Sequence, residues 1–131
     1  MVFPATIENA ITNGAIPEDL PGKAQLFDLC NEGERRCALV RAMIIAKARK
    51  DNFPHRTDRQ GWLAWVQERW SYDSARIHRM LRVGNILTDS LGKVARVPLF
   101  DAPIGKLEEI IMLWEAKPDH LDAWLKRVDI A

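Results

Sequence analysis

The sequence predicts an all-α protein, folded as a single domain of five or six helices. Apolar residues recur at spacings of three or four in several stretches, which places them on one side of a helix. Residues with good capping side chains precede some of these stretches, and no run alternates well enough to predict a strand. With 131 residues, of which 47% are hydrophobic, the chain suits one domain with a real core.

Residues 1–22 are predicted to form an N-terminal arm, which precedes a helical domain of residues 23–131. Turn-forming residues interrupt this segment at Pro4, Asn13-Gly14, Pro17 and Pro21-Gly22. They leave room for at most one short helix, around residues 6–11. Such an arm either lies across a dimer partner or packs on its own domain or frays, and we favour the second outcome.

A long helical pattern covers residues 23–50, and the run NEG at 31–33 is where it could divide in two. Its apolar stripe has near-heptad spacing and consists of Leu26, Cys30, Cys37, Val40 and Ile44. The stripe is too short for a coiled coil, so core packing is favoured over a dimer seam. The basic residues on or near the other face either are solvated or contact phosphate: Arg35, Arg36, Arg41, Lys47, Arg49 and Lys50.

Nothing in the sequence indicates an active site, so we expect no enzyme, no metal and no cofactor. His55, His78 and His120 are far apart, and none has metal-binding spacing. There is no glycine-rich phosphate loop and no nucleophile elbow. On a continuous helix, Cys30 and Cys37 would lie roughly 10 Å apart, too far for a disulfide. Both are therefore predicted to be reduced core cysteines.

The run WLAWVQERW predicts a core-facing helix. A loop at residues 51–58 is predicted to precede it, and in this loop His55 and Arg56 either are solvated or touch phosphate. The helix has an apolar stripe of Trp62, Trp65, Val66 and Trp70. Its outward residues are Ala64, Gln67 and Glu68, while Arg69 falls on the stripe and must lead its charge out to water. The tryptophans are interpreted as core residues rather than as stacking platforms for single-stranded nucleic acid.

A second helix is predicted from Ser74, after the turn SYD, with Asp73 as its N-cap. Gly84 would allow a neighbouring backbone to approach closely. The predicted buried residues are Ile77, Met80, Leu81 and Leu87. The predicted outward residues are Arg76, His78, Arg79 and Arg82, with Ser74 at the edge.

Two short helices with a tight turn and a basic outer face on the second fit a helix-turn-helix, placed here at about residues 60–87. The alternative is an ordinary helical hairpin with a solvated basic face. In a DNA complex, the residues expected to face the major groove are Ser74, Arg76, His78, Arg79 and Arg82. Those expected to contact the DNA backbone are Arg56, Arg59 and Lys93 or Arg96.

The stretch WLAWVQERW followed by SYDSARIHRML resembles a helix-turn-helix family of phages and mobile elements. In that family an aromatic-rich helix leads through a short turn into a recognition helix, and Tyr72 resembles its turn aromatic. The run VPLFDAPIGKLEEIIMLWEA is similar to the proline- and leucine-rich segment that follows the motif there and in partition-protein-like DNA binders. Two residues depart from the pattern: Ser71 replaces a common turn glycine, and Ala75 replaces a common polar residue.

That last run also predicts a helix, with Asp101 as N-cap and Pro103 in its first turn. Its predicted buried face is Leu107, Ile110, Ile111 and Trp114. The run KPD at 117–119 ends this helix, and Asp119 is predicted to cap a final one. The inward residues of the final helix are Leu121, Trp124, Leu125 and Val128.

Charge is distributed unevenly, although the net charge is only +1. Residues 1–34 carry one Lys against six acids, residues 35–96 fourteen Lys and Arg against five, and residues 97–131 four against seven. A basic centre of this kind attracts phosphate. No apolar run approaches the roughly 20 residues of a membrane span, and no signal peptide is recognisable, so a cytoplasmic location is predicted.

These features together predict a small accessory or regulatory protein that binds duplex DNA, and the resemblance implies a phage or mobile-element origin. A homodimer is expected if binding is specific, because one short helix reads few base pairs. The alternative is a helical protein-interaction module, such as a phage-borne inhibitor or adaptor, that uses the same scaffold without DNA readout.

Overall fold

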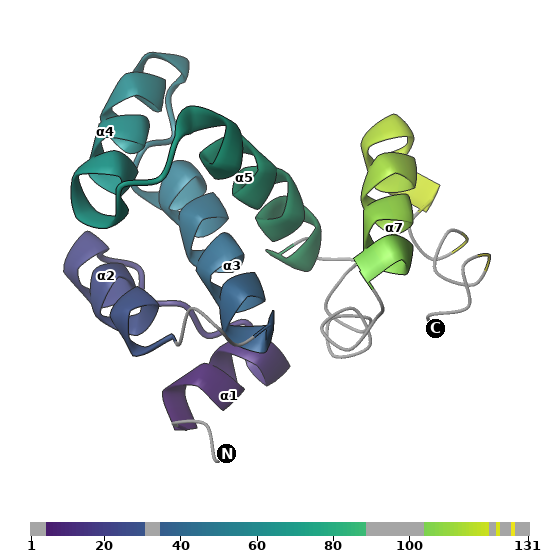
Figure 1. Ribbon diagram of the computed structural model, residues 1–131, viewed down its shortest axis with the longest axis horizontal. Helices are drawn as coiled ribbons and strands as arrows, with labels where there is room; N and C mark the ends of the chain where they lie inside the picture. The colour runs from purple at the N-terminus through teal and green to yellow at the C-terminus, as the bar shows by residue number, and fades with distance from the viewer. Residues whose placement is uncertain (1–4, 31–34, 89–103, 121–122, 124–126, 128–131) are drawn as a thin grey trace.

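A computed structural model describes residues 5–30, 35–88, 104–120, 123 and 127. Over these residues the protein is a single all-helical domain without strands, which confirms the predicted fold class (Figure 1). The six α-helices in the described part are α1 (Ala5–Asn13), α2 (Leu20–Leu29), α3 (Arg35–Asp51), α4 (Arg59–Trp70), α5 (Ser74–Thr88) and α7 (Ile104–Ala116). Short 3-10 helices, η1 and η2, cover Arg56–Asp58 and Pro118–His120. No helix in the described ranges is long and apolar enough to cross a membrane.

Helix α3 lies at the centre of the domain, in contact with α1, α2, α4 and α5 (Figure 1). Its residues Val40, Met43, Ile44 and Ile45 are fully buried. Helix α5 packs along it so closely that there is no space for a side chain at Gly84. A Cβ there would lie 2.7 Å from both the Ala42 carbonyl carbon and the Ala46 Cβ. The predicted close approach of a neighbouring backbone at Gly84 is therefore confirmed.

The N-terminal residues predicted to form an arm contribute to the same core. Ile7 and Ile11 of α1 are buried, as is Ile16 in the connection that follows. Helix α2 begins at Leu20, because Asp19 caps it by accepting a hydrogen bond from the Gly22 amide at 3.2 Å. The first helix thus extends beyond the predicted residues 6–11, and the second begins before residue 23.

The long pattern of residues 23–50 forms two helices, since α2 ends at Leu29 and α3 begins at Arg35. Cys30 and Cys37 therefore do not lie on one continuous helix, which was the condition for their predicted separation of roughly 10 Å. Cys30 and Cys37 are both buried free thiols, as predicted for reduced core cysteines. Burial is the main cause that raises the pKa of the Cys30 thiol to about 12, and Cys37 raises it further as a charged neighbour and side-chain hydrogen-bond partner.

Helix α4 presents its apolar stripe to the core as predicted. Trp62 and Val66 are fully buried, and the Trp62 indole donates to the Ile45 carbonyl at 3.1 Å. Trp70 is partly buried and stacks on Phe27 with a centroid separation of 3.6 Å. These contacts agree with a core role for the tryptophans of α4. Arg69 is exposed, with its guanidinium 5.8 Å from the centre of the Trp65 ring.

Helix α7 lies on the far side of α5 from α1 and α2 (Figure 1). Ile110 and Ile111 are buried, as the sequence predicts. Asp119 lies inside η2. The remaining predictions for the C-terminal part concern residues or side chains outside the described set: Asp101, Pro103, Leu107, Trp114, Leu121, Trp124, Leu125 and Val128.

Candidate nucleic-acid interface

The connection between α4 and α5 is a three-residue turn at the position that the sequence predicts. Ser71 ends α4 in the left-handed conformation, with φ 54° and ψ 31°, while its amide donates to the Gln67 carbonyl. Asp73 then caps α5, because its Oδ1 accepts from the Arg76 amide at 2.7 Å. Ser71 therefore has the conformation that glycine adopts most easily.

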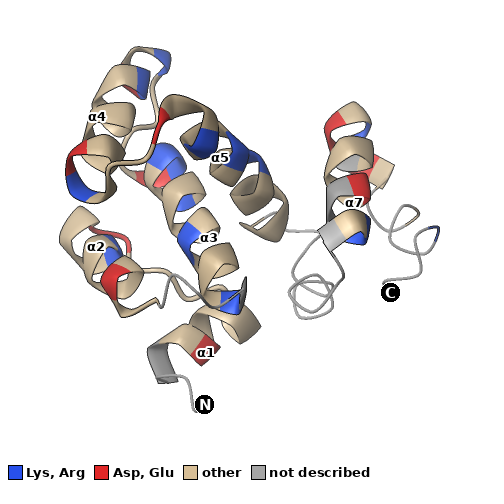
Figure 2. Cartoon of the chain, viewed as in Figure 1, with Lys and Arg blue, Asp and Glu red and all other residues tan. Residues whose placement is uncertain are grey.

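Helix α5 has one buried and one basic side. Ile77, Gly84 and Leu87 are buried, together with Ile86, which the sequence analysis did not select. Met80 and Leu81 are partly buried. On the other side Ser74, Arg76, Arg79 and Arg82 are exposed, and Figure 2 shows the basic residues following one another along α5. We call these four residues, with Arg56 and Arg59, the basic face.

His78 differs from the expectation that it faces outward. Its ring is half-buried and lies edge-on to Trp62, 6.0 Å between centroids. The Arg59 Nη2 approaches His78 Nε2 at 2.7 Å, and His78 Nδ1 lies 2.7 Å from the Ser74 carbonyl. Arginine can only donate, so Nε2 accepts and Nδ1 carries the proton that is donated to Ser74. His78 thereby joins the start of α4 to the first turn of α5.

Arg76 is held over the turn. Its guanidinium lies 4.0 Å from the centre of the Tyr72 ring, a cation-π arrangement. Tyr72 is buried, and its hydroxyl accepts from Arg41 Nη1 at 3.1 Å. Arg41 also donates to the Cys30 carbonyl at 2.6 Å. Arg41 is thus half-buried, and its guanidinium donates to groups on the core side of the turn. The sequence pattern instead predicts that Arg41 lies on or near the outer face of its helix.

Arg82 is paired with α7. Its Nε and Nη2 donate to the two carboxylate oxygens of Glu115 at 2.6 and 2.9 Å. This fork-like pair raises the pKa of the Arg82 guanidinium, chiefly through the hydrogen bond with Glu115 and then through its charge. No spacing rule predicts this contact, because the two residues are 33 positions apart.

The loop before α4 is ordered by Arg49, which donates to the carbonyls of Phe53 and His55, the latter at 3.0 Å. The His55 amide donates in turn to Asp58 at 3.0 Å. Residues predicted to be a plain loop thus include the η1 turn. His55 and Arg56 are exposed there, and Arg59 starts α4 beside them. Lys93 and Arg96, predicted to contact the DNA backbone, lie outside the described residues.

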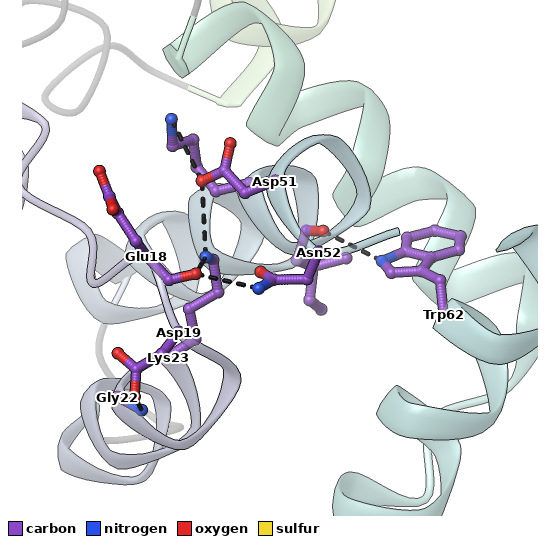
Figure 3. Close-up of polar contacts among 9 residues, drawn as sticks. Glu18, Asp19, Gly22, Lys23, Asp51, Asn52 and Trp62 are labelled. Atoms are coloured by element: carbon purple, nitrogen blue, oxygen red, sulfur yellow. Dashed lines mark hydrogen bonds and ion pairs between the residues drawn. The ribbon is translucent and has the colours of Figure 1, made fainter. Parts of the chain in front are cut away.

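A second polar cluster surrounds a buried lysine (Figure 3). The Lys23 side chain is fully buried and donates to the Glu18 carbonyl at 2.7 Å. It also lies 3.5 Å from Asp51 Oδ2, which Lys47 approaches at the same distance. Burial lowers the pKa of Lys23, although Asp51 opposes the shift. The cluster fastens α2 to the end of α3, and no motif in the sequence predicts it.

Within the part of the chain that the structure describes, no three His, Cys, Asp or Glu side chains gather in a way that could hold a metal ion. Comparison of the chain with protein-family models, with curated proteins and with solved structures found no match.

Proposed function

We propose that this protein binds duplex DNA, with α4 and α5 acting as a helix-turn-helix and α5 entering the major groove. The observation that carries the proposal is the exposed row of Ser74, Arg76, Arg79 and Arg82 on a helix whose opposite side is buried. Guanidinium groups in this position suit both phosphate oxygens and guanine edges. Arg56 in η1 and Arg59 at the start of α4 are suited to backbone contacts.

The proposed role is that of a small accessory or regulatory protein of a phage or mobile element, a context suggested by the resemblance. A homodimer follows from the same proposal, since two short recognition helices read a longer site than one. Three features support DNA binding through α5, because they hold the first turn of this helix in one orientation. They are the three-residue turn, the Asp73 cap and the Tyr72–Arg76 contact.

The test is fluorescence anisotropy of a labelled random-sequence duplex at low and moderate salt. The variant Arg76→Ala/Arg79→Ala/Arg82→Ala should abolish most of the binding, and wild-type affinity should fall steeply with salt. A matched pair sharpens the result: Arg79→Ala on α5 and Arg69→Ala on α4 each remove one exposed arginine. Arg79→Ala should weaken binding several-fold and reduce the salt slope by about one, whereas Arg69→Ala should have little effect.

Two results would contradict the proposal. Equal losses in Arg79→Ala and Arg69→Ala would indicate attraction by overall charge without a defined surface. Absence of wild-type binding at low salt would refute DNA affinity altogether.

A second candidate function is a helical protein-interaction module, such as an inhibitor or adaptor. The Arg82–Glu115 pair favours this candidate, because Arg82 of the basic face already donates two hydrogen bonds to a carboxylate. Pull-down with wild-type protein and with the triple variant tests this candidate. A partner that is lost with the triple variant, together with no DNA binding, would favour the interaction module.

A further inference from the structure

Among the described residues, the Arg82–Glu115 pair is a polar contact that ties α7 to α5. It is accessible to water, since the two side chains keep 55% and 34% of their surface exposed. Glu115 lies in the last turn of α7, where the unpaired carbonyls of the helix disfavour a negative charge. Its carboxylate therefore gains little from its own helix, and Arg82 supplies the compensating charge.

The rest of the contact between α5 and α7 is incompletely packed. A cavity of about 270 Å³ lies between the two helices, lined by Arg79, Arg82, Val83, Ile111 and Met112. Met112 leaves 67% of its surface exposed at this edge. Among the described side chains of α7, Ile110 and Ile111 are buried. A cavity and an exposed ion pair at the contact hold a helix less firmly than close packing does.

A carboxylate and a phosphate present the same kind of acceptor to a guanidinium group, namely two oxygens that receive parallel N–H donors. Arg82 cannot use the same Nε and Nη2 donors for both. Glu115 occupies the Nε–Nη2 edge of the guanidinium and places a negative charge beside its remaining donors, so a DNA phosphate approaching Arg82 meets an occupied edge and electrostatic repulsion. This argument rests on the function proposed above.

We propose that α7 is an acidic latch, fastened to α5 by Glu115, which competes with DNA for Arg82. While the latch is closed, the Nε–Nη2 edge of Arg82 is taken up and its charge is compensated by Glu115. DNA binding displaces the carboxylate and loosens α7. By thermodynamic linkage, loosening α7 strengthens DNA binding by the same factor.

The experiment compares Glu115→Gln with Glu109→Gln. Both residues are exposed on α7, and each substitution removes one negative charge. The first measurement is amide hydrogen exchange of residues 104–116 in the free protein. Glu115→Gln should accelerate exchange there, and Glu109→Gln should not.

The second measurement is the dissociation constant for the random-sequence duplex at low salt. An exposed ion pair that competes with phosphate should suppress affinity by about three- to fivefold. Glu115→Gln should therefore bind that much more tightly than wild type, and Glu109→Gln should show only the smaller gain that any lost negative charge produces. When Arg82→Ala is combined with either glutamine substitution, the two double variants should bind the duplex with equal dissociation constants.

Equal gains in the two glutamine variants would overturn the latch, since net charge would then explain them. Unchanged exchange of α7 in Glu115→Gln would overturn it as well, whether or not DNA binds. If no variant binds DNA, the proposed function fails, and with it the competition. The exchange measurement would then decide separately whether Glu115 fastens α7.

Discussion

Gly84 of α5 lies directly against the carbonyl group of Ala42 in α3. Any Cβ at this position would overlap backbone atoms of α3, which cannot move aside without disturbing the central helix. The contact sets the separation of the two helices, and so it sets the position from which α5 presents its basic side.

Gly84→Ala is therefore expected to destabilise the fold by about 2–3 kcal/mol or more, because the helices must move apart. Gly105→Ala is the control: a Cβ there meets nothing within 4 Å, and alanine in a helix gains up to about 1 kcal/mol over glycine. Urea unfolding of the two variants measures both effects. A stable Gly84→Ala variant would show that α3 and α5 tolerate a wider separation.

Ser71→Gly should stabilise the protein by roughly 1 kcal/mol at most, since glycine adopts the left-handed conformation of this turn without the steric penalty of a Cβ. Ser74→Gly, three residues later in the first turn of α5, places glycine in an ordinary helical conformation and should be destabilising. Thermal unfolding distinguishes the two. If both variants lose stability, Ser71 contributes through its side chain rather than through its backbone conformation.

Lys23 should make stability depend on pH in the alkaline range. Burial lowers its pKa in the folded protein below the ordinary value of 10.5. Between the lowered pKa and 10.5 the unfolded chain binds more protons than the folded one, so stability rises with pH across that window. Below the lowered pKa the cost of burying the charge is fully present.

The measurement is the free energy of unfolding against pH for wild type and for Lys23→Met, which keeps an apolar stem but cannot ionise. The rise should be absent from the variant, so the difference between the two curves isolates Lys23. Lys50→Met, at an exposed position on α3, is the control and should leave the wild-type slope unchanged. Parallel curves for wild type and Lys23→Met would show that Lys23 does not titrate in this window.

Much of the local structure was predictable from neighbouring residues. Asp73 was identified as a cap because a carboxylate needs only the free amides two or three residues ahead. The spacing of Trp62 and Val66 placed both on one side of a helix, and both are buried. The exposure of Arg76 and Arg79 was predictable in the same way, from the period of α5. The division between α2 and α3 is not determined by local sequence, because NEG permits a break but does not require one.

Contacts between distant residues were not predictable. Cys30 interacts with Cys37 although the two do not share a helix, since α2 ends at Leu29 and α3 begins at Arg35. Lys23 is buried between two residues that are far apart in the sequence. Its ammonium group donates to the Glu18 carbonyl and lies near the Asp51 carboxylate. Tyr72 and Arg41 are 31 positions apart, and no spacing rule links them.

The sequence by itself determined that this protein is helical, where α4 and α5 end, and which side of α5 is basic. These properties depend on residues within about one helical turn, and the period of the helix converts them directly into faces and caps. Only the tertiary structure decided which partners the basic side chains contact. Arg41 donates to Tyr72 on the core side of the turn, Arg59 contacts His78, and Arg82 donates to Glu115. Those pairings depend on how the helices pack against one another, and the direction of packing is set by the whole core.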